Sequence, residues 1–361
     1  FQKLRSFDFI LVLCVLILGL VSNLSMFSTD GGEFLYHTKS HLIRFVVFFV
    51  LMLFLSFFSL RFWHSTAYLF YIVVLGFLIW ASLYGVTASG SQRWINLYFI
   101  NLQPSELMKI AIIVCFARFF HREQITSVSS FKNIIVSLAI LVMPIVLVVS
   151  QPDLGTSILI AASGLIVLWL AGLNIRYFVY SGLILLVSFP FVISFLKPYQ
   201  KLRILSFFNP DRDPLGAGYQ IIQSKIAVGS GGLLGKGFLQ GTQSYLEFLP
   251  EKHTDFIFTL FSEEQGFVGS VFLLIIYGIL IYRIIKIGSI SRSYFGRLFC
   301  YGFGSAIFIY IAVNMSMVLG LLPIVGSPLP IMSYGGSSML ATMIGLSIVM
   351  STKIYHKQII N

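Results

Sequence analysis

Apolar runs of about 20 residues recur along this chain, and their length is the strongest constraint on its fold. A membrane-spanning α-helix needs about 20 mainly apolar residues, because each residue advances the helix by about 1.5 Å. The runs are continuous rather than alternating, which argues against a transmembrane β-barrel. The sequence therefore predicts an all-α polytopic membrane protein with about ten transmembrane helices. We place them at about 7–25, 42–59, 66–84, 104–120, 133–150, 153–171, 176–196, 256–282, 298–321 and 332–352.

Composition excludes a soluble globular protein. The 361 residues are 57% hydrophobic and 10% charged, whereas soluble domains carry about 25% charged residues. We expect one transmembrane domain over 1–361. Cys14, Cys115 and Cys300 lie inside apolar runs and predict neither a disulfide framework nor a metal site. Lys3 and Arg5 precede the first run without a clear small-residue cleavage site, which predicts a retained span rather than a removed signal peptide.

The basic residues predict an orientation. With a cytoplasmic N-terminus, thirteen of them fall at cytoplasmic ends of spans and three in short outer segments, as the positive-inside rule expects. Both termini are then cytoplasmic, and one long extracytoplasmic loop, 197–255, joins spans seven and eight. The net charge of +11 is explained by this placement, so we predict no nucleic-acid partner. The three outer residues are Lys39, Arg44 and Arg93.

Turn-rich segments gather on the predicted outer face, so we expect any chemistry there. They lie at 90–106, at 151–157, in the long loop and at 323–338. Within the loop, 219–229 predicts a short amphipathic helix that could lie in the membrane interface. The glycine-dense stretch 229–241 is compatible with a phosphate cradle or with a flexible re-entrant loop.

The acids are scarce, thirteen in all, so their positions are informative. Counted back from Arg283, Glu263 falls at the outer edge of the hydrocarbon core. Asp255 then lies about 12 Å further out if the helix is continuous, at the depth of lipid headgroups. A helix N-cap is the alternative role for Asp255. His253 predicts a polar interfacial residue rather than a metal ligand, because no second His or Cys lies at ligand spacing.

Other charged residues each allow two interpretations. Glu106 and Lys109 share one helical face, so they form either a structural ion pair or a polar site. Asp153 is a helix-start acid or a ligand group, and Arg93 is an interfacial anchor or a phosphate clamp. The acid–x–acid pattern at 211–213 is typical of some metal-dependent glycosyltransferases, but its flanking prolines favour a plain turn.

Several strings of the sequence resemble one family. They are "RWI", "QPSELMK", "QPDLGT", "NPDRDPLGAGYQ", "PEKHTDFIF" followed by "EEQGFVG", and "GLLPIVGSPLPIMSYGGSS", in this order from about 92 to 338. The chain resembles the SEDS proteins, named for shape, elongation, division and sporulation. Its short N-terminal tail is more like RodA, the elongation member, than like FtsW, the division member.

The resemblance implies a peptidoglycan glycosyltransferase of the cytoplasmic membrane that polymerises lipid II beside a class B penicillin-binding transpeptidase. It makes Asp255 the catalytic residue. We expect no metal ligands and no certain cofactor, although a divalent cation, Mg or Mn, stays open. The alternatives are a lipid-linked precursor flippase and a non-enzymatic scaffold for a transpeptidase. The expected substrate-binding residues are Arg93, Glu106, Lys109, Asp153, Lys225 and Ser333.

Overall fold

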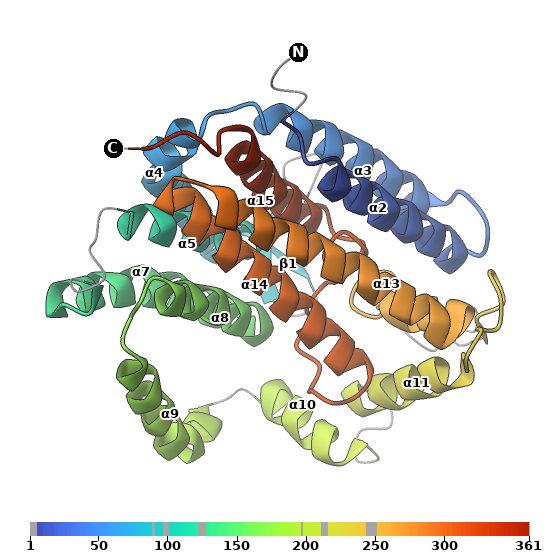
Figure 1. Ribbon diagram of the computed structural model, residues 1–361. Helices are drawn as coiled ribbons and strands as arrows, with labels where there is room; N and C mark the ends of the chain where they lie inside the picture. The colour runs from blue at the N-terminus through green and yellow to red at the C-terminus, as the bar shows by residue number, and fades with distance from the viewer. Residues whose placement is uncertain are drawn as a thin grey trace.

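The chain folds into a bundle of α-helices with one small β-sheet (Figure 1). The computed structural model describes residues 6–88, 91–96, 101–121, 128–195, 198–210, 216–242 and 251–360. The first half holds α2 (Phe9–Thr29), α3 (Tyr36–Leu55), α4 (Leu60–Tyr84), α5 (Pro104–Phe119), α7 (Phe131–Ser150) and α8 (Leu154–Leu170). The second half holds α9 (Ile175–Phe195), α10 (Pro198–Phe208), α11 (Ala217–Ser230), α13 (Ile257–Ile290), α14 (Tyr294–Val318) and α15 (Gly336–Ile354).

Each of the ten predicted spans coincides with a helix, which confirms the polytopic α-helical fold. Seven helices are long and apolar enough to cross a membrane, namely α2, α3, α4, α7, α13, α14 and α15. The other three span-like helices are α8, α9 and the more polar α5. The predicted boundary of the second span was wrong, because α3 begins at Tyr36 and already contains Lys39 and Arg44.

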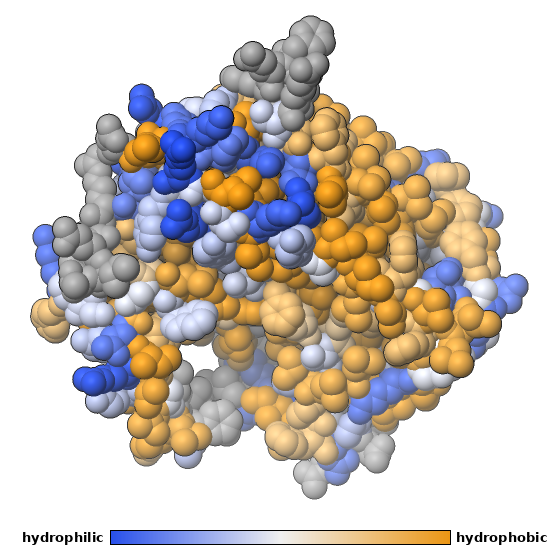
Figure 2. Space-filling model, in the orientation of Figure 1, coloured by the Kyte–Doolittle hydropathy of each residue, from blue (hydrophilic) through white to orange (hydrophobic). Residues whose placement is uncertain are grey.

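The helices differ in how they are buried. Every residue of α5 from Pro104 to Ala117 is buried, so α5 is the central helix, and it packs against α4 and α8. The outer helices α2, α3 and α4 expose large apolar side chains, and Figure 2 shows a largely hydrophobic face along α2 and α13. An exposed apolar belt of this kind suits contact with lipid. Helix α9 stands apart from the bundle, and the molecule is hollowed beside it (Figures 1 and 2).

A three-stranded antiparallel sheet follows α4 in the order β1–β2–β3 and was not predicted from the sequence. Strand β1 (Val86–Ala88) pairs with β2 (Ser91–Asn96), and β2 pairs with β3 (Asn101–Leu102). The register is irregular after Val86. The sheet carries Arg93 on β2 and leads directly into α5. It therefore holds a polar strand at the N-terminal end of the central helix.

The long segment between α9 and α13 is partly helical. The predicted helix at 219–229 is confirmed as α11. The glycine-dense stretch after it is held against the first residues of α13. Its backbone N–H groups at 236 and 237 donate to the carbonyls of Glu263 and Glu264, 3.0 Å away in both cases. The acid–x–acid pattern at 211–213 lies outside the described residues.

The backbone of this glycine stretch contacts α13 at a kink in that helix. Gly266 has φ 64° and ψ −162°, a conformation open to glycine. A Cβ there would lie 2.3 Å from the backbone nitrogen of Gly235. The assumption of a continuous helix from Asp255 inward is therefore wrong. Glu263 lies on a short first segment, where it pairs with Lys236 at 2.7 Å, and Ser28 donates to Glu264.

The start of α2 and the end of α15 lie at the same end of the bundle (Figure 1), where Asp8 and Lys353 line one pocket. Arg283 near the end of α13 forms an ion pair with Asp8, and the Arg292 amide donates to the carbonyl of His356 at 2.9 Å. The predicted site segments lie at the opposite ends of the same helices. The position of both ends on one side of the bundle agrees with the expected topology.

Candidate functional site

Asp255 lies in the turn 251–256, directly before α13. The N-cap position of α13 is Phe256, so the alternative role of Asp255 as the helix cap is not realised. Its carboxyl group faces Gly326, where an added Cβ would be 3.5 Å from Asp255 Oδ2. Its backbone carbonyl accepts a hydrogen bond of 2.9 Å from Asn314 Nδ2, which also donates to the carbonyl of Ser327 at 2.6 Å. Asn314 on α14 thus holds the Asp255 turn against the 323–335 loop.

The surroundings of Asp255 make its carboxyl group a weak acid. Burial raises its pKa to about 7, and the negative charge of Glu251 acts in the same direction. The guanidinium groups of Arg93 and Arg203 oppose this rise, and the Asp153 carboxylate adds to it. A carboxyl group whose pKa is near neutrality can accept a proton and release it again under physiological conditions.

Arg93, Asp153 and Gln103 form one polar network beside this carboxyl group. Arg93 Nη1 lies 3.1 Å from Asp153 Oδ2, and Gln103 Nε2 donates to the same oxygen at 3.1 Å. Asp153 Oδ1 accepts from the Thr156 backbone N–H at 3.1 Å, which confirms the predicted helix-start role on α8. Asp153 therefore links the sheet, the start of α5 and the start of α8.

The 323–335 loop closes over the start of α8. Gly155 permits this contact, because a Cβ there would lie only 1.7 Å from the carbonyl oxygen of Val325. Arg203 Nη1 on α10 donates to the carbonyl of Ile324 at 3.2 Å. At the other end of the loop, the Tyr334 amide donates to the carbonyl of His253 at 2.9 Å. The loop therefore joins α8, α10 and the Asp255 turn.

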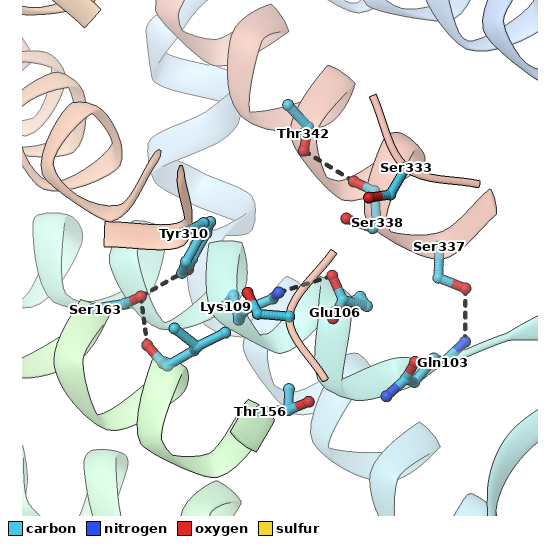
Figure 3. Close-up of polar contacts among 12 residues, drawn as sticks. Gln103, Glu106, Lys109, Thr156, Ser163, Tyr310, Ser333, Ser337, Ser338 and Thr342 are labelled. Atoms are coloured by element: carbon cyan, nitrogen blue, oxygen red, sulfur yellow. Dashed lines mark hydrogen bonds and ion pairs between the residues drawn. The ribbon is translucent and has the colours of Figure 1, made fainter. Parts of the chain in front are cut away.

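Glu106 and Lys109 form a second polar group, on the central helix α5 (Figure 3). Their side chains are buried and lie 2.8 Å apart, so the predicted pairing is confirmed. Lys109 Nζ also lies 4.6 Å from the centre of the Tyr310 ring, and Tyr310 shares a hydrogen bond of 2.7 Å with Ser163. Contacts of this kind stabilise a charge that the apolar bundle would otherwise disfavour.

Lys225 and Ser333 are the two remaining predicted residues. Lys225 on α11 is exposed and runs along Gly320, where an added Cβ would meet its side chain. Ser333 is buried, and its hydroxyl accepts from the Leu329 backbone N–H at 2.7 Å. Ser333 thus stabilises a turn of the 323–335 loop, and its binding of substrate stays a prediction.

The structure brings Asp255, Asp153 and Arg93 into one electrostatic environment, although 162 positions separate the outer two in sequence. Sequence reasoning missed Asn314, Arg203 and Gln103. A lone Asn in an apolar run is costly in a membrane and could have been noticed. Gln103 is the first residue of the string "QPSELMK", which could have marked it. Arg203 lies among ordinary neighbours, and only its contacts mark it.

Comparisons with known proteins agree with this architecture. The model of the cell cycle protein family of FtsW, RodA and SpoVE matches residues 5–358. The chain belongs to this family. It is therefore a SEDS protein, as the sequence motifs predicted.

Two curated relatives of this SEDS protein illustrate the likeness. The peptidoglycan glycosyltransferase MrdB of Escherichia coli K12 is 47% identical over 290 residues, which cover 80% of this chain and 78% of MrdB. The stage V sporulation protein E of Bacillus subtilis strain 168 is 32% identical, over 98% of this chain and 99% of the relative.

Solved structures share the fold. A chain from a study of structural coordination of polymerization and crosslinking by a peptidoglycan synthase complex superposes with a TM-score of 0.82. It is 29% identical and covers 98% of this chain and 99% of its own. The rod shape determining protein RodA of Thermus thermophilus superposes at 0.74, with 24% identity and 98% coverage of both chains.

Proposed function

We propose that this SEDS protein is a peptidoglycan glycosyltransferase that polymerises lipid II for cell elongation and rod shape. The observation that carries the proposal is the Asp255 carboxyl group, with a pKa of about 7, beside Arg93 and Arg203. The 47% identity to MrdB, a protein named for this activity, supports it. We place the reaction at the outer face of the cytoplasmic (inner) membrane of a bacterium, on the basic-residue asymmetry of the sequence.

The proposed reaction needs a base and positive charge. A hydroxyl group of the acceptor sugar attacks the anomeric carbon of the donor, and its proton passes to the Asp255 carboxylate. A new C–O bond forms while the bond from the anomeric carbon to undecaprenyl pyrophosphate breaks. The departing pyrophosphate carries the negative charge and is stabilised by nearby cations. The Asp255 carboxylate supplies the base, and the neighbouring Arg93 and Arg203 supply the positive charge.

The candidate cations for binding the pyrophosphate differ in whether an acidic side chain already neutralises them. Arg93 is already paired with Asp153, and Lys109 is buried against Glu106. Arg203 is exposed and donates one described hydrogen bond, to a neutral backbone carbonyl. We therefore assign the pyrophosphate to Arg203 first, with Arg93 second. Glu106, Lys109, Asp153, Lys225 and Ser333 remain proposed contributors to the substrate site.

The residues around Asp255 fit a Mg or Mn cation poorly. Glu251 and Asp153 are the neighbouring acids. Asp153 Oδ2 already accepts from Arg93 and Gln103 and its Oδ1 from the Thr156 amide, and Glu251 Oε2 accepts from the Thr254 hydroxyl at 2.8 Å. Among the described residues, these acids form no group of three with Asp255 whose ligand atoms lie within 4.8 Å of one another. Mg²⁺ needs several free oxygen ligands in octahedral geometry. We therefore derive no step of the proposed reaction through a divalent cation.

A class B penicillin-binding transpeptidase is the proposed partner. One structural relative comes from a complex that couples polymerization to crosslinking, and our chain shares its fold over nearly the whole length. Cross-linking consumes the polymer that glycan synthesis supplies, so a joint assembly is chemically sensible.

Purified protein with lipid II tests the proposal. We expect glycan polymer from the wild type and from the exposed-acid control Glu33→Gln, and none from Asp255→Asn. Loss of a general base commonly costs about 10²–10⁴-fold in rate. Translocation of lipid II across vesicles without polymer would favour the flippase alternative. Neither activity, even with the transpeptidase present, would favour the scaffold.

A further inference from the structure

Three side chains with metal-binding atoms meet where α2, α3 and the Asp255 turn come together. Asp30 follows the last residue of α2, His37 lies in the first turn of α3, and His253 lies two residues before Asp255. His253 Nε2 is 3.2 Å from Asp30 Oδ1, and His37 Nδ1 is 3.6 Å from the same oxygen. Within the described ranges, this is the one group of three His, Cys or acidic residues whose ligand atoms lie within 4.8 Å of one another.

The carboxylate of Asp30 is oriented by Thr38. Its Oδ2 accepts hydrogen bonds from the backbone N–H of Thr38 at 2.9 Å and from the hydroxyl of Thr38 at 2.6 Å. This arrangement leaves Oδ1 facing the two imidazole rings. Carboxylates that bind metal ions are typically held by hydrogen bonds of this kind, which fix the position of the ligating oxygen.

The contact between His253 and Asp30 has the length of a hydrogen bond, so the His37 contact decides between a hydrogen-bonded cluster and a metal site. A hydrogen bond between a nitrogen and an oxygen spans about 2.7–3.2 Å, so the 3.6 Å separation of His37 from Asp30 is too long. Two ligands of a tetrahedral zinc ion lie about 3.3 Å apart, given bond lengths of about 2.0–2.1 Å. The separations of 3.2 and 3.6 Å lie on either side of that value.

We propose that Asp30, His37 and His253 bind a divalent first-row transition metal ion, with Zn²⁺ as the best fit. Imidazole nitrogens favour such ions, whereas Mg²⁺ prefers oxygen ligands alone. The side chain of His37 is 42% exposed, so a fourth position on that side is open to water. The ion would tie α2 and α3 to the turn that carries Asp255, and it would act by positioning that turn.

Zinc binding by the purified full-length protein tests the site, independently of any glycosyltransferase activity. The protein is stripped with a chelator, dialysed against Zn²⁺ and analysed for zinc per chain. Co²⁺ then replaces Zn²⁺ to report the ligand geometry by visible absorption. We expect one zinc per wild-type chain and an affinity that excess Mg²⁺ does not reduce. Thr38→Val should weaken binding about 10–100-fold, and His37→Gln should weaken it more.

His356→Gln is the matched control, because His356 lies at the opposite end of the bundle beside Arg292. It should bind zinc like the wild type. Zn²⁺ should also raise the Tm of the wild type but not of His37→Gln. His37 is partly exposed and Asp30 is buried. We therefore expect His37→Gln to remain folded even if Asp30→Asn does not. Equal zinc binding by the wild type and His37→Gln, or a wild type that binds no zinc, overturns the proposal.

Discussion

Asp255 gains its chemical character from residues distant in sequence. Burial and the neighbouring Glu251 favour the neutral carboxyl group, while Arg93 and Arg203 favour the charged one, and the balance sets the pKa at about 7. Asn314 holds the backbone of the same residue. A general base works best when its pKa lies near the working pH, because it is then ionised yet still a good proton acceptor.

The pH dependence of polymerisation should follow this carboxyl group. We expect kcat/KM to rise about tenfold per pH unit below pH 7 and to level off above it, because the base must be ionised to accept a proton. Initial rates measured from pH 5 to 9 test this. A wild-type rate that does not change across pH 7 would contradict the assignment of Asp255 as the base.

Stability provides an independent check on the same pKa. The ordinary pKa of an Asp carboxyl group is 3.8, so between pH 4 and 7 the unfolded chain binds fewer protons than the native one. The wild type should therefore lose stability as the pH rises through this window. Asp255→Asn does not ionise, so its Tm should exceed that of the wild type by a few degrees at pH 8, with the gap narrowing toward pH 4. Thermal melts at both pH values measure this, and a gap unchanged by pH would contradict the raised pKa.

At the scale of elements, α5 is a central helix that carries a buried ion pair. Lys109 contacts Glu106 on its own helix and Tyr310 on α14, so the pair also joins two helices (Figure 3). Removing one charge leaves the other buried without its partner, which costs about 3–5 kcal/mol. Removing both avoids that penalty.

We therefore expect Lys109→Met to be much less stable than the double variant Glu106→Gln with Lys109→Met. Thermal unfolding in detergent and polymerisation by the surviving protein measure the two effects separately. If the double variant is stable but inactive, the pair contributes to the substrate site. If the double variant is no more stable than Lys109→Met, an unpaired Glu106 does not explain the lost stability of the single variant.

The contact between α8 and the 323–335 loop depends on one glycine. Gly155→Ala places a methyl group 1.7 Å from the carbonyl oxygen of Val325, so the loop must move away from α8. Because the same loop faces Asp255, we expect both a lower Tm and at least a tenfold loss of polymerisation. Gly76→Ala in α4 is the control, since an added Cβ there meets nothing within 4 Å. Alanine favours helix over glycine by up to about 1 kcal/mol, so this control should be neutral or stabilising. Equal behaviour of the two variants would contradict the role of the contact.

The sequence predicted elements better than contacts. Ten apolar runs became ten helices, because run length alone determines whether a helix can span a membrane. The Glu106–Lys109 pair and the Asp153 cap were predicted because both are local. The kink at Gly266 depends on backbone bonds to the 229–241 segment, and the His253 cluster depends on residues more than 200 positions away. Such features follow from tertiary packing, which no local pattern encodes.

At the scale of the whole molecule, the two ends of the bundle differ in chemistry. One end gathers the termini and the basic residues Arg283, Arg292 and Lys353. The other gathers Asp255, the sheet and the 323–335 loop. The proposed polymerisation outside the cell needs the second end to face outward, and the positive-inside rule independently predicts a cytoplasmic position for the first end.

Labelling of single cysteines in intact cells tests this orientation. Cys14, Cys115 and Cys300 are buried, so the natural chain is a low-reactivity background. We expect Gln240→Cys, in the glycine stretch, to react with a membrane-impermeant thiol reagent added outside, and Arg292→Cys to react only after the membrane is permeabilised. A cysteine at 211 should behave like the one at 240. The unsubstituted chain, labelled in parallel, measures the background. Labelling at 292 but not at 240 in intact cells would invert the topology, place Asp255 in the cytoplasm and remove polymerisation outside the cell as the function of this site.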